Sequence, residues 1–490
     1  MIRPILLLIW VFACVPVMSV AQFFTKAQVE EEMNLIRKRL DRYHPNPYFY
    51  TSSSALDSTQ HVLLARLPDR VSFSEAYLTL ATLVSRVQDG HTGVYLPKKA
   101  FGKNPKQAPL FLRKIGTQYR LSYNATPDST WIRGSEIIAV AGQDIQDWVQ
   151  IFSHLIGDDR DNPQANFYYP VANFSNYLLR MTGEVDSVEV LFRLPDSTQI
   201  QKRYLPTQTM KESIKWISKR YPSALKKNFR YVLLDSTQKV ATLEISSFTL
   251  AGKFLDIPQF KFRRSVKQAF HRIKQDSVQN LILDLRGNGG GFIPNIARLM
   301  RYIGSEPFSL LDSISFKKSA FWQVGMPQSI MGPLFVRLAY QSKGDYFVRY
   351  ASRRKYKLSE VNRFNGKLTV LMDGGSYSAT TFTIGLLADQ KRATFIGTTP
   401  GGANWGSFAG SWQNKKLPYT RINTHIPLFQ LVHRLPNQSV STFFVEPDYW
   451  VQPTEKEFFN RQDGVLEFAK QWHGVSTAKP QKTESHLKNK

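Results

Sequence analysis

Residues 367–406 constrain the fold of this chain more than any other stretch of its sequence. Residues 368–372 are apolar apart from Thr369, which predicts a strand buried on both faces. The Asp-Gly-Gly at 373–375 ends that strand, and from Ser378 onward apolar residues recur at helical spacing. A second strand and a glycine-rich loop follow. The pattern predicts an α/β unit with a serine at the start of a helix.

Ser378 has two interpretations. A small hydroxyl residue at the start of a helix lies beside unpaired backbone N–H groups and at the positive end of the helix dipole. It can therefore cap the helix or act as a nucleophile, and the local pattern alone favours the cap. The rest of the chain has to decide between the two.

The chain has 490 residues, enough for about two to four domains. Its formal net charge is +26, and the basic runs contain no recognisable nucleic-acid-binding motif. We therefore expect a solvated basic surface, with an anionic envelope surface as an alternative partner and no nucleic acid.

The first 21 residues contain one early arginine, an apolar run and a final Ser19-Val20-Ala21, which is the form of a secretory signal peptide. The apolar run is too short for a comfortable transmembrane helix. Cleavage after Ala21 removes Cys14, the only cysteine, so the mature chain has neither disulfides nor a catalytic cysteine. We predict export to the periplasm or the extracellular space. Acylation of Cys14 as a lipoprotein anchor is the less favoured alternative.

The next part of the chain predicts a helical region followed by a β-rich one. Helices are expected after Thr25 and over 54–67 and 72–87, and the third ends at QDGHTG, residues 88–93. His91 in that motif is, taken alone, a histidine of an exposed turn. Residues 110–205 have the pattern of short strands, with a closing hairpin at 188–205.

From residue 231 the pattern becomes α/β. A strand at 281–285 runs into DLRGNGGG, residues 284–291, and a helix follows over 293–302. Glycines between a strand and a helix let the backbone approach a ligand closely and direct N–H groups at an anion. The spacing fits neither a dinucleotide fingerprint nor a P-loop. Residues 305–366 form a long aromatic and basic insertion, typical of a lid, a groove or an interface, and a terminal helix is expected over about 455–472.

Three motifs in this order, DGHT at 89–92, DLRGNGGG at 284–291 and GSYSAT at 375–380, resemble the C-terminal-processing (tail-specific) and tricorn-like serine peptidases. The resemblance extends over nearly all of the mature chain. It implies a ClpP/crotonase-like β-α core, an N-terminal helical domain and a PDZ-like β-rich domain, for which residues 131–149 have the order of turns, strand and helix. The activity that it implies is hydrolysis of polypeptides, with no cofactor.

Carried over motif by motif, the resemblance implies that Ser378 is the nucleophile and that the backbone N–H groups of Ala379 and Gly290 form the oxyanion hole. Tail-specific proteases keep a lysine base in the loop after the nucleophile helix, where this chain has Ala403. The tricorn-like branch uses a histidine from the N-terminal part of the chain, which falls on His91. A neutral imidazole can take the serine proton and return it to the leaving amine.

The third catalytic residue stays open, with Asp89 adjacent in sequence and Glu446 assigned to a structural motif. We expect Asp284 and Arg286 to pair around the glycine loop, and Asp389 to be structural. A metal site is not expected, because His44, His425 and His433 are isolated in the sequence and lack ligand spacing.

The sequence therefore predicts an exported serine endopeptidase. Its expected divisions are a signal peptide (1–21), a helical domain (22–100), a PDZ-like domain (105–205), a basic connector (206–230), a peptidase core with the insertion 305–366 (231–473) and a basic tail (474–490). The alternative is a catalytically silent protein of the same fold that binds peptides or lipophilic ligands. A structural envelope protein acting through its basic surface is a further alternative, and oligomerisation stays open.

Overall fold

The structure is a computed structural model that describes residues 23–96, 100–222, 228–250, 258–320, 339–342, 345–348, 354–437 and 443–474. The predicted signal peptide, Cys14 and all but the first residue of the predicted basic tail lie outside these ranges. The chain divides into two compact units. The first comprises Met1–Asp161, Asn166–Leu225 and Trp412–Pro427, and the second comprises Asn162–Ala165, Lys226–Ser411 and Leu428–Lys490.

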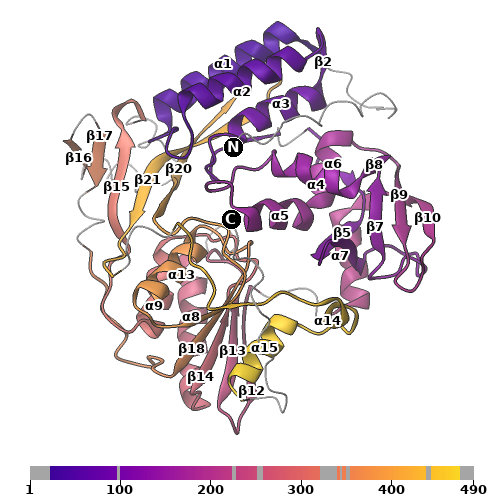
Figure 1. Cartoon of the computed structure of the whole chain (residues 1–490). Coiled ribbons are helices and arrows are strands. Elements are labelled where there is room, and N and C mark those ends of the chain that lie inside the picture. The colour runs from indigo at the N-terminus through magenta and orange to yellow at the C-terminus, as the bar shows by residue number, and fades with distance from the viewer. Residues whose placement is uncertain are drawn as a thin grey trace, which may run out of the picture. The chain divides into compact units, whose positions relative to one another are not determined.

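The first unit begins with three helices that pack together (Figure 1). They are α1 (Lys26–Tyr43), α2 (Ser53–Arg66) and α3 (Phe73–Ser85), and a short pair of strands, β1 (Phe23–Thr25) and β2 (Arg70–Ser72), accompanies them. Thr25 forms a capping box with Gln28 at the start of α1, as the sequence indicated. The predicted helices are confirmed to within two residues at each end.

An antiparallel sheet forms the β-rich part of the first unit, in the strand order β10-β9-β7-β6-β5, with β8 beside β7. Its strands are β5 (Leu110–Ile115), β6 (Gln118–Asn124), β7 (Glu136–Val140), β8 (Gln143–Asp144), β9 (Ser187–Arg193) and β10 (Ile200–Pro206). The pairing of β9 with β10 confirms the predicted closing hairpin. Helix α7 (Met210–Arg220) follows, and β4 (Lys106–Gln107) pairs with β11 (Gln208–Thr209).

The expectation of mainly strands between 110 and 205 is wrong for residues 163–182. Beyond the anticipated α4 (Ile145–Ser153), the chain forms α5 (Pro163–Ala172) and α6 (Phe174–Thr182). Pro170 inside α5 and the aromatic run at 167–169 are poor helix signals, and they hid the helical period. Asn162 starts α5 by accepting the N–H of Gln164, with proline at the first helical position.

The second unit is built on a six-stranded sheet in the order β12-β13-β14-β18-β19-β22. The strands are β12 (Phe229–Asp235), β13 (Val240–Ile245), β14 (Asn280–Asp284), β18 (Lys367–Met372), β19 (Thr394–Gly397) and β22 (Tyr449–Trp450). Every neighbouring pair is parallel except β12 with β13. The carboxyl ends of β14 and β18 are therefore adjacent at one edge, so the turns that follow them begin side by side.

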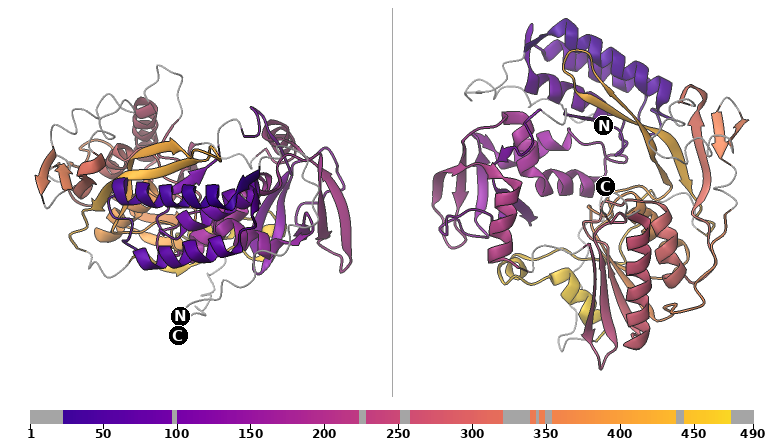
Figure 2. Two further views of the ribbon diagram at one scale, coloured as in Figure 1. Left: turned by 90° about the horizontal axis from the view of Figure 1, so that it is seen from above. Right: turned by 180° about the vertical axis from the view of Figure 1, so that it is seen from behind.

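Helices cover both faces of this sheet. Val465 and Ala469 of α15 (Gly464–Trp472) pack against Ile282, Leu371 and their neighbours on one face. Alternate strand residues point to the opposite face, where α8 (Pro258–Gln275) and α9 (Pro294–Ile303) run side by side (Figure 2). The predicted single terminal helix is divided into α14 (Glu455–Phe459) and α15, because Asp463 accepts the N–H of Leu466 and starts a new helix.

A second sheet carries the order β16-β17-β15-β21-β20. It comprises β15 (Leu311–Lys317), β16 (Ala339–Ser342), β17 (Asp345–Val348), β20 (Gly406–Lys416) and β21 (Asn423–His433), with a 3-10 turn, η1 (Lys318–Ala320), after β15. Of the predicted insertion 305–366, residues 311–317, 339–342 and 345–348 form strands of this sheet. The first residues of β21 pair with β3 (Gly93–Tyr95) in the first unit. None of the helices in the described ranges combines the length and the apolar character that a membrane crossing requires.

Candidate active site

Ser378 occupies the sharp turn between β18 and α13 (Ala379–Asp389). Its backbone has φ 57° and ψ −121°, a conformation that is strained for a residue with a Cβ atom. Although Ser378 holds the N-cap position, its side chain makes no capping hydrogen bond to the helix. The cap interpretation favoured by the local sequence is therefore wrong. The structure holds a serine in a strained turn at a helix N-terminus, where the backbone dipoles favour negative charge.

The turn before Ser378 is fastened to the glycine loop by side chains of its own. Asp373 Oδ1 accepts the N–H of Gly287 at 2.8 Å and that of Gly375 at 3.0 Å. The Ser376 hydroxyl donates to the carbonyl of Leu285 at 2.9 Å. Burial raises the pKa of Asp373, although the N–H of Gly287 and the charge of Arg286 lower it. These bonds make the two turns one rigid structure.

Gly290 lies directly against the start of α13, with φ 97°. A Cβ atom at this position would lie 2.8 Å from the Ala379 nitrogen and 2.8 Å from the Ser378 Cβ, closer than any side chain can approach. Tyr377 donates its N–H to the carbonyl of Asn288 at 3.0 Å, which holds the two turns at this spacing. Only glycine fits here, for reasons of both space and backbone conformation.

Two candidate oxyanion donors have different hydrogen bonding. Ala379 is the first residue of α13, so its N–H has no acceptor within the helix. The Gly290 N–H donates to Asn288 Oδ1 at 2.9 Å, and the Asn288 amide donates in turn to the carbonyl of Ile245. The donor on Gly290 is therefore engaged by Asn288 in this structure.

Asp284 and Arg286 pair beside the glycine loop, as expected. Arg286 Nη2 lies 2.6 Å from Asp284 Oδ2 and 2.7 Å from Asp463 Oδ2. Burial acts to lower the pKa of Arg286, but the two carboxylates outweigh it and raise that pKa. The guanidinium thus fastens the start of α15 to the end of β14, and its role is structural.

The loop that follows β19 has an alanine at the position where the resemblance leads one to expect a lysine base. Ala403, at the position of the family lysine, is buried. Its neighbour Asn404 accepts a hydrogen bond at its carbonyl from His433 Nδ1 at 2.8 Å, and the His433 ring stacks on Phe382 with 3.6 Å between centroids. Burial lowers the pKa of His433 to about 3, so this imidazole is neutral and structural. Asp389 also has a structural role, because its carboxylate accepts the N–H of Asn437.

The segment Asn162–Ala165 contributes to the same unit although it is distant in sequence. Asn162 Nδ2 donates to the carbonyl of Pro400 at 2.8 Å. Gln164 packs against Gly374 in the turn before Ser378, and Ala165 packs against Gly401. The sequence carries no local signal for these contacts.

His91 belongs to the first unit, in a turn whose geometry is set by Asp89. The Asp89 Oδ1 atom accepts the backbone N–H of His91 at 3.1 Å and lies 3.9 Å from His91 Nδ1. The His91 side chain is 13% exposed, while Asp89 is buried. His91 is thus partly accessible, with a carboxylate beside its ring, and the expectation of an exposed turn histidine is too simple.

His44 anchors that carboxylate, a role that no local sequence pattern indicates. His44 is buried, its Nδ1 accepts the N–H of Asn46, and its Nε2 lies 3.1 Å from Asp89 Oδ2. Because Nδ1 accepts, the proton resides on Nε2 and is donated to Asp89. Burial opposes ionisation of Asp89, but His44, His91 and Thr92 outweigh it and hold the pKa of Asp89 below its usual value.

His425, which the sequence presented only as an isolated histidine, is a third histidine of this region. Its ring stacks on Trp412 and meets Tyr95 edge-on, with 5.1 Å between the centroids of His425 and Tyr95. Burial and the charge of His91 lower the pKa of His425 to about 4. Within the described part of the chain, no three His, Cys, Asp or Glu side chains are grouped in a way that suits a metal ion.

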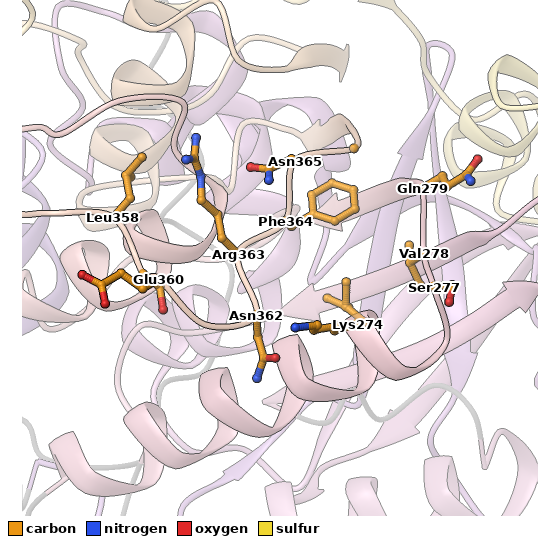
Figure 3. Close-up of a pocket in the computed structure, with 13 residues that line it drawn as sticks. Lys274, Ser277, Val278, Gln279, Leu358, Glu360, Asn362, Arg363, Phe364 and Asn365 are labelled. Atoms are coloured by element: carbon orange, nitrogen blue, oxygen red, sulfur yellow. The ribbon is translucent and has the colours of Figure 1, made fainter.

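A pocket of about 690 Å³ lies elsewhere in the second unit (Figure 3). It is lined by the end of α8, including Lys274, and by residues 358–366, which precede β18. Ser378 and Gly290 follow the carboxyl ends of β18 and β14, whereas this pocket lies at the amino ends of the same strands. A strand of five or six residues spans about 17–20 Å, so the pocket is separate from the serine.

Comparison with known proteins agrees with this geometry. Residues 239–417 match the model of peptidase family S41. Among solved structures, mature CPAF complexed with lactacystin has a TM-score of 0.64 at 15% identity, covering 92% of this chain and 98% of that one. Mature CPAF alone has a TM-score of 0.62 at 15% identity, covering 91% and 96%. At this identity the likeness to CPAF concerns the fold. No curated protein matches by sequence.

The matched segment contains both turns described above, the glycine loop after β14 and the Ser378 turn after β18. It also contains the four neighbouring strands β13, β14, β18 and β19 that position them. Residues 239–417 thus match peptidase family S41, and this match identifies the chain as a serine-type peptidase.

Proposed function

We propose that this protein is an exported endopeptidase that hydrolyses polypeptides through an acyl-enzyme on Ser378. The observation that carries the proposal is the strained Ser378 at the start of α13, with Gly290 packed against it. A serine held with φ 57° and without a capping bond stores strain that a helix start does not require. Such strain is characteristic of nucleophiles on strand-to-helix turns.

In the proposed reaction, the Ser378 Oγ attacks the peptide carbonyl while His91 takes its proton. The tetrahedral intermediate collapses, the C–N bond breaks, and His91 returns the proton to the leaving amine. Water then attacks the acyl-enzyme with His91 again as base, which releases the acid product and restores Ser378. Since the two residues belong to different units, their approach is part of the proposal.

The oxyanion would be stabilised first by the N–H of Ala379 and by the positive end of the α13 dipole. Gly290 becomes the second donor when its N–H, which donates to Asn288 Oδ1, donates to the oxyanion instead or to both acceptors at once. A carbonyl oxygen that gains charge competes well for this hydrogen, because charge-assisted hydrogen bonds are the stronger ones.

Asp89 is proposed to orient His91 and to stabilise the imidazolium that forms during the reaction. The support is the 3.9 Å separation between the Asp89 carboxylate and His91 Nδ1, and the His44 proton that fixes the carboxylate. Glu446 accepts a hydrogen bond from Thr399 and is assigned to the loop structure.

We further propose that the second unit is a ClpP/crotonase-like core and that residues 105–205 form a PDZ-like domain. The six-stranded parallel-rich sheet and the antiparallel sheet with α4 support these assignments. The domain divisions, the signal peptide at 1–21, the periplasmic or extracellular location, the anionic envelope surface and any oligomer are proposals of the same standing, based on the sequence.

The proposal is tested by substitution and by active-site labelling. Ser378→Ala should abolish hydrolysis of fluorescein-labelled casein and labelling by a fluorophosphonate, with the circular dichroism spectrum unchanged. His91→Ala should lower kcat by about 10³-fold or more, whereas Lys391→Ala should change it less than about twofold.

Undiminished turnover in Ser378→Ala would overturn the assignment, and a greater loss in Lys391→Ala than in His91→Ala would indicate a lysine base. Saturable peptide binding without any acyl-enzyme would support the silent binding protein instead.

A further inference from the structure

Arg180 is a partly buried cation in the first unit whose described partners include no carboxylate. It lies on α6, and its Nη1 donates to the Tyr77 hydroxyl at 3.0 Å. Its guanidinium also lies over the Tyr177 ring, 5.0 Å from the centroid. The residues outside the described ranges include only two acidic ones, Asp256 and Glu484.

A guanidinium has five N–H donors in a planar fork that matches a carboxylate. Only one hydrogen bond from Arg180 to a described residue is formed, and its acceptor is a neutral hydroxyl. Taking a cation out of water without an anion is unfavourable, so half-buried arginines ordinarily pair with carboxylates. The remaining donors of Arg180 suit an anion supplied from outside the chain.

Tyrosines around Arg180 add donors but no negative charge. Tyr77 lies on α3, Tyr177 on α6 and Tyr95 on β3, and α3 contacts both α6 and β3. Burial raises the pKa of Tyr95 and of Tyr177, so both hydroxyls keep their protons. The cluster of Arg180 with Tyr77, Tyr95 and Tyr177 is therefore cationic and rich in hydrogen-bond donors.

The cluster adjoins the turn that carries His91. The ring of Tyr95 folds back over Gly93, two residues after His91, and it meets the His425 ring edge-on. The charge of Arg180 lowers the pKa of Tyr95 and that of Asp89 raises it, so both charges act on this side chain. Tyr95 is 45% exposed, so part of this residue faces solvent although its surroundings are buried enough to raise its pKa. A ligand held by Arg180 would thus lie close to the proposed general base, within the same unit.

We propose that Arg180 binds a carboxylate of the polypeptide substrate, either an acidic side chain or the C-terminal group, and so determines specificity. This inference rests on the proposed peptidase function, because it concerns how that enzyme selects its substrates. The bound carboxylate would serve as the counter-ion of Arg180 and would accept two charge-assisted hydrogen bonds from it. Neutral peptides would leave the guanidinium without a counter-ion.

The test measures binding in the full chain carrying Ser378→Ala, so that it does not depend on turnover. The probes are fluorescein-labelled decapeptides of alanine, leucine and glycine in which one glutamate occupies each position in turn. Each has a glutamine counterpart, and a neutral peptide is made with a free or an amidated C-terminus. We expect one glutamate position, or the free C-terminus, to bind about tenfold more tightly than its neutral counterpart. Arg180→Gln should remove that difference.

Arg113→Gln is the matched control, because it removes one exposed arginine from β5 of the same unit and lowers the net charge equally. It should keep the full preference. Arg180→Glu should transfer the preference to lysine-containing peptides, an outcome that a merely structural arginine would not give. Arg180→Lys, which keeps the charge but loses the planar fork, should retain part of the preference even if Arg180→Gln fails to fold.

The inference is overturned if no carboxylate position is preferred, if the preference survives Arg180→Gln, or if Arg113→Gln abolishes it equally. These results are distinguishable from failure of the proposed function. A protein that shows the Arg180-dependent preference but hydrolyses nothing with Ser378 intact would retain the carboxylate site and lose the peptidase assignment.

Discussion

At the scale of single residues, the backbone conformation of Ser378 lowers the stability of the folded protein. Its φ of 57° and ψ of −121° suit glycine and are strained for any residue with a Cβ atom. The surrounding structure nevertheless imposes them, through the bonds that Asp373, Ser376 and Tyr377 make to the glycine loop. The residue therefore has a measurable energetic signature that does not depend on any assay of activity.

This strain predicts that Ser378→Gly is more stable than Ser378→Ala by about 1 kcal/mol. Relief of about 1–3 kcal/mol of backbone strain exceeds the roughly 0.5–1 kcal/mol that glycine loses through its greater freedom when unfolded. Urea unfolding of the two variants, followed by tryptophan fluorescence, measures the difference.

Ser58 provides the matched control, because it lies exposed in the interior of α2. There the order must reverse, with Ser58→Gly less stable than Ser58→Ala by about 1 kcal/mol. If both positions behave alike, Ser378 does not have the strained conformation described here.

At the scale of elements, the candidate site depends on two turns that leave neighbouring parallel strands. Asp284 of β14 pairs with Leu371 of β18, so the glycine loop and the Ser378 turn begin at the same edge of the sheet. Gly290 packs so tightly against the start of α13 that a Cβ atom has no room there. The spacing of the turns, more than any single side chain, determines where the Ala379 N–H points.

Replacement of that glycine should therefore damage catalysis more than stability. In Gly290→Ala, the new Cβ would have to displace Tyr377 O, Ala379 N and Ser378 Cβ, which lie 2.7–2.8 Å from its ideal position. Loss of an oxyanion donor lowers kcat by about 10²–10³-fold. We expect a fall of this size in hydrolysis of labelled casein.

Gly102→Ala is the control, since Gly102 also has a positive φ, 73°, but no atom lies within 4 Å of its ideal Cβ. Both variants should lose about 1 kcal/mol of stability through backbone strain. Gly290→Ala should lose more because of its clash with the start of α13, and it alone should lose activity. Retention of kcat within threefold in Gly290→Ala would contradict the role given to this loop.

At the scale of the whole molecule, segments distant in sequence complete each unit. The first unit is completed by residues 412–427, in which Thr420 lies 388 positions after Glu32 of α1. Glu32 of α1 is fully buried and accepts the N–H groups of Tyr419 and Thr420 at 2.7 and 2.9 Å, and the Thr420 hydroxyl at 2.8 Å. A chain that ends before this hairpin would leave a buried carboxylate without these donors.

Glu32→Gln should therefore destabilise the first unit by about 2 kcal/mol, because three charge-assisted hydrogen bonds become neutral or are lost. Hydrogen exchange followed by mass spectrometry should show faster exchange in α1 and in residues 412–427. Glu30→Gln, an exposed position on the same helix, should change stability by less than about 0.5 kcal/mol. Equal effects of the two substitutions would argue against this role of Glu32.

Much of the fold could be predicted from the sequence, because its signals are local. Capping residues and apolar spacing predicted α1, α2 and α3, and the glycine clusters after two apolar runs predicted the turns that follow β14 and β18. Local signals failed at α5, where Pro170 and an aromatic run obscure the helix, and at α14 and α15, which Asp463 separates. Residues 163–182 show that tertiary packing can override weak local propensity.

The sequence by itself determined that a serine and a glycine loop each follow a strand, and by resemblance it assigned their roles. Only the tertiary structure showed that Ser378 is strained and makes no capping bond, that Gly290 touches the start of α13, and that His44 fixes Asp89 beside His91. Contacts of this kind join residues 45 to 388 positions apart, and no neighbouring residue in the sequence signals them. Backbone strain and burial arise from the whole fold, which is why the local pattern at Ser378 favoured a helix cap and the folded chain does not contain one.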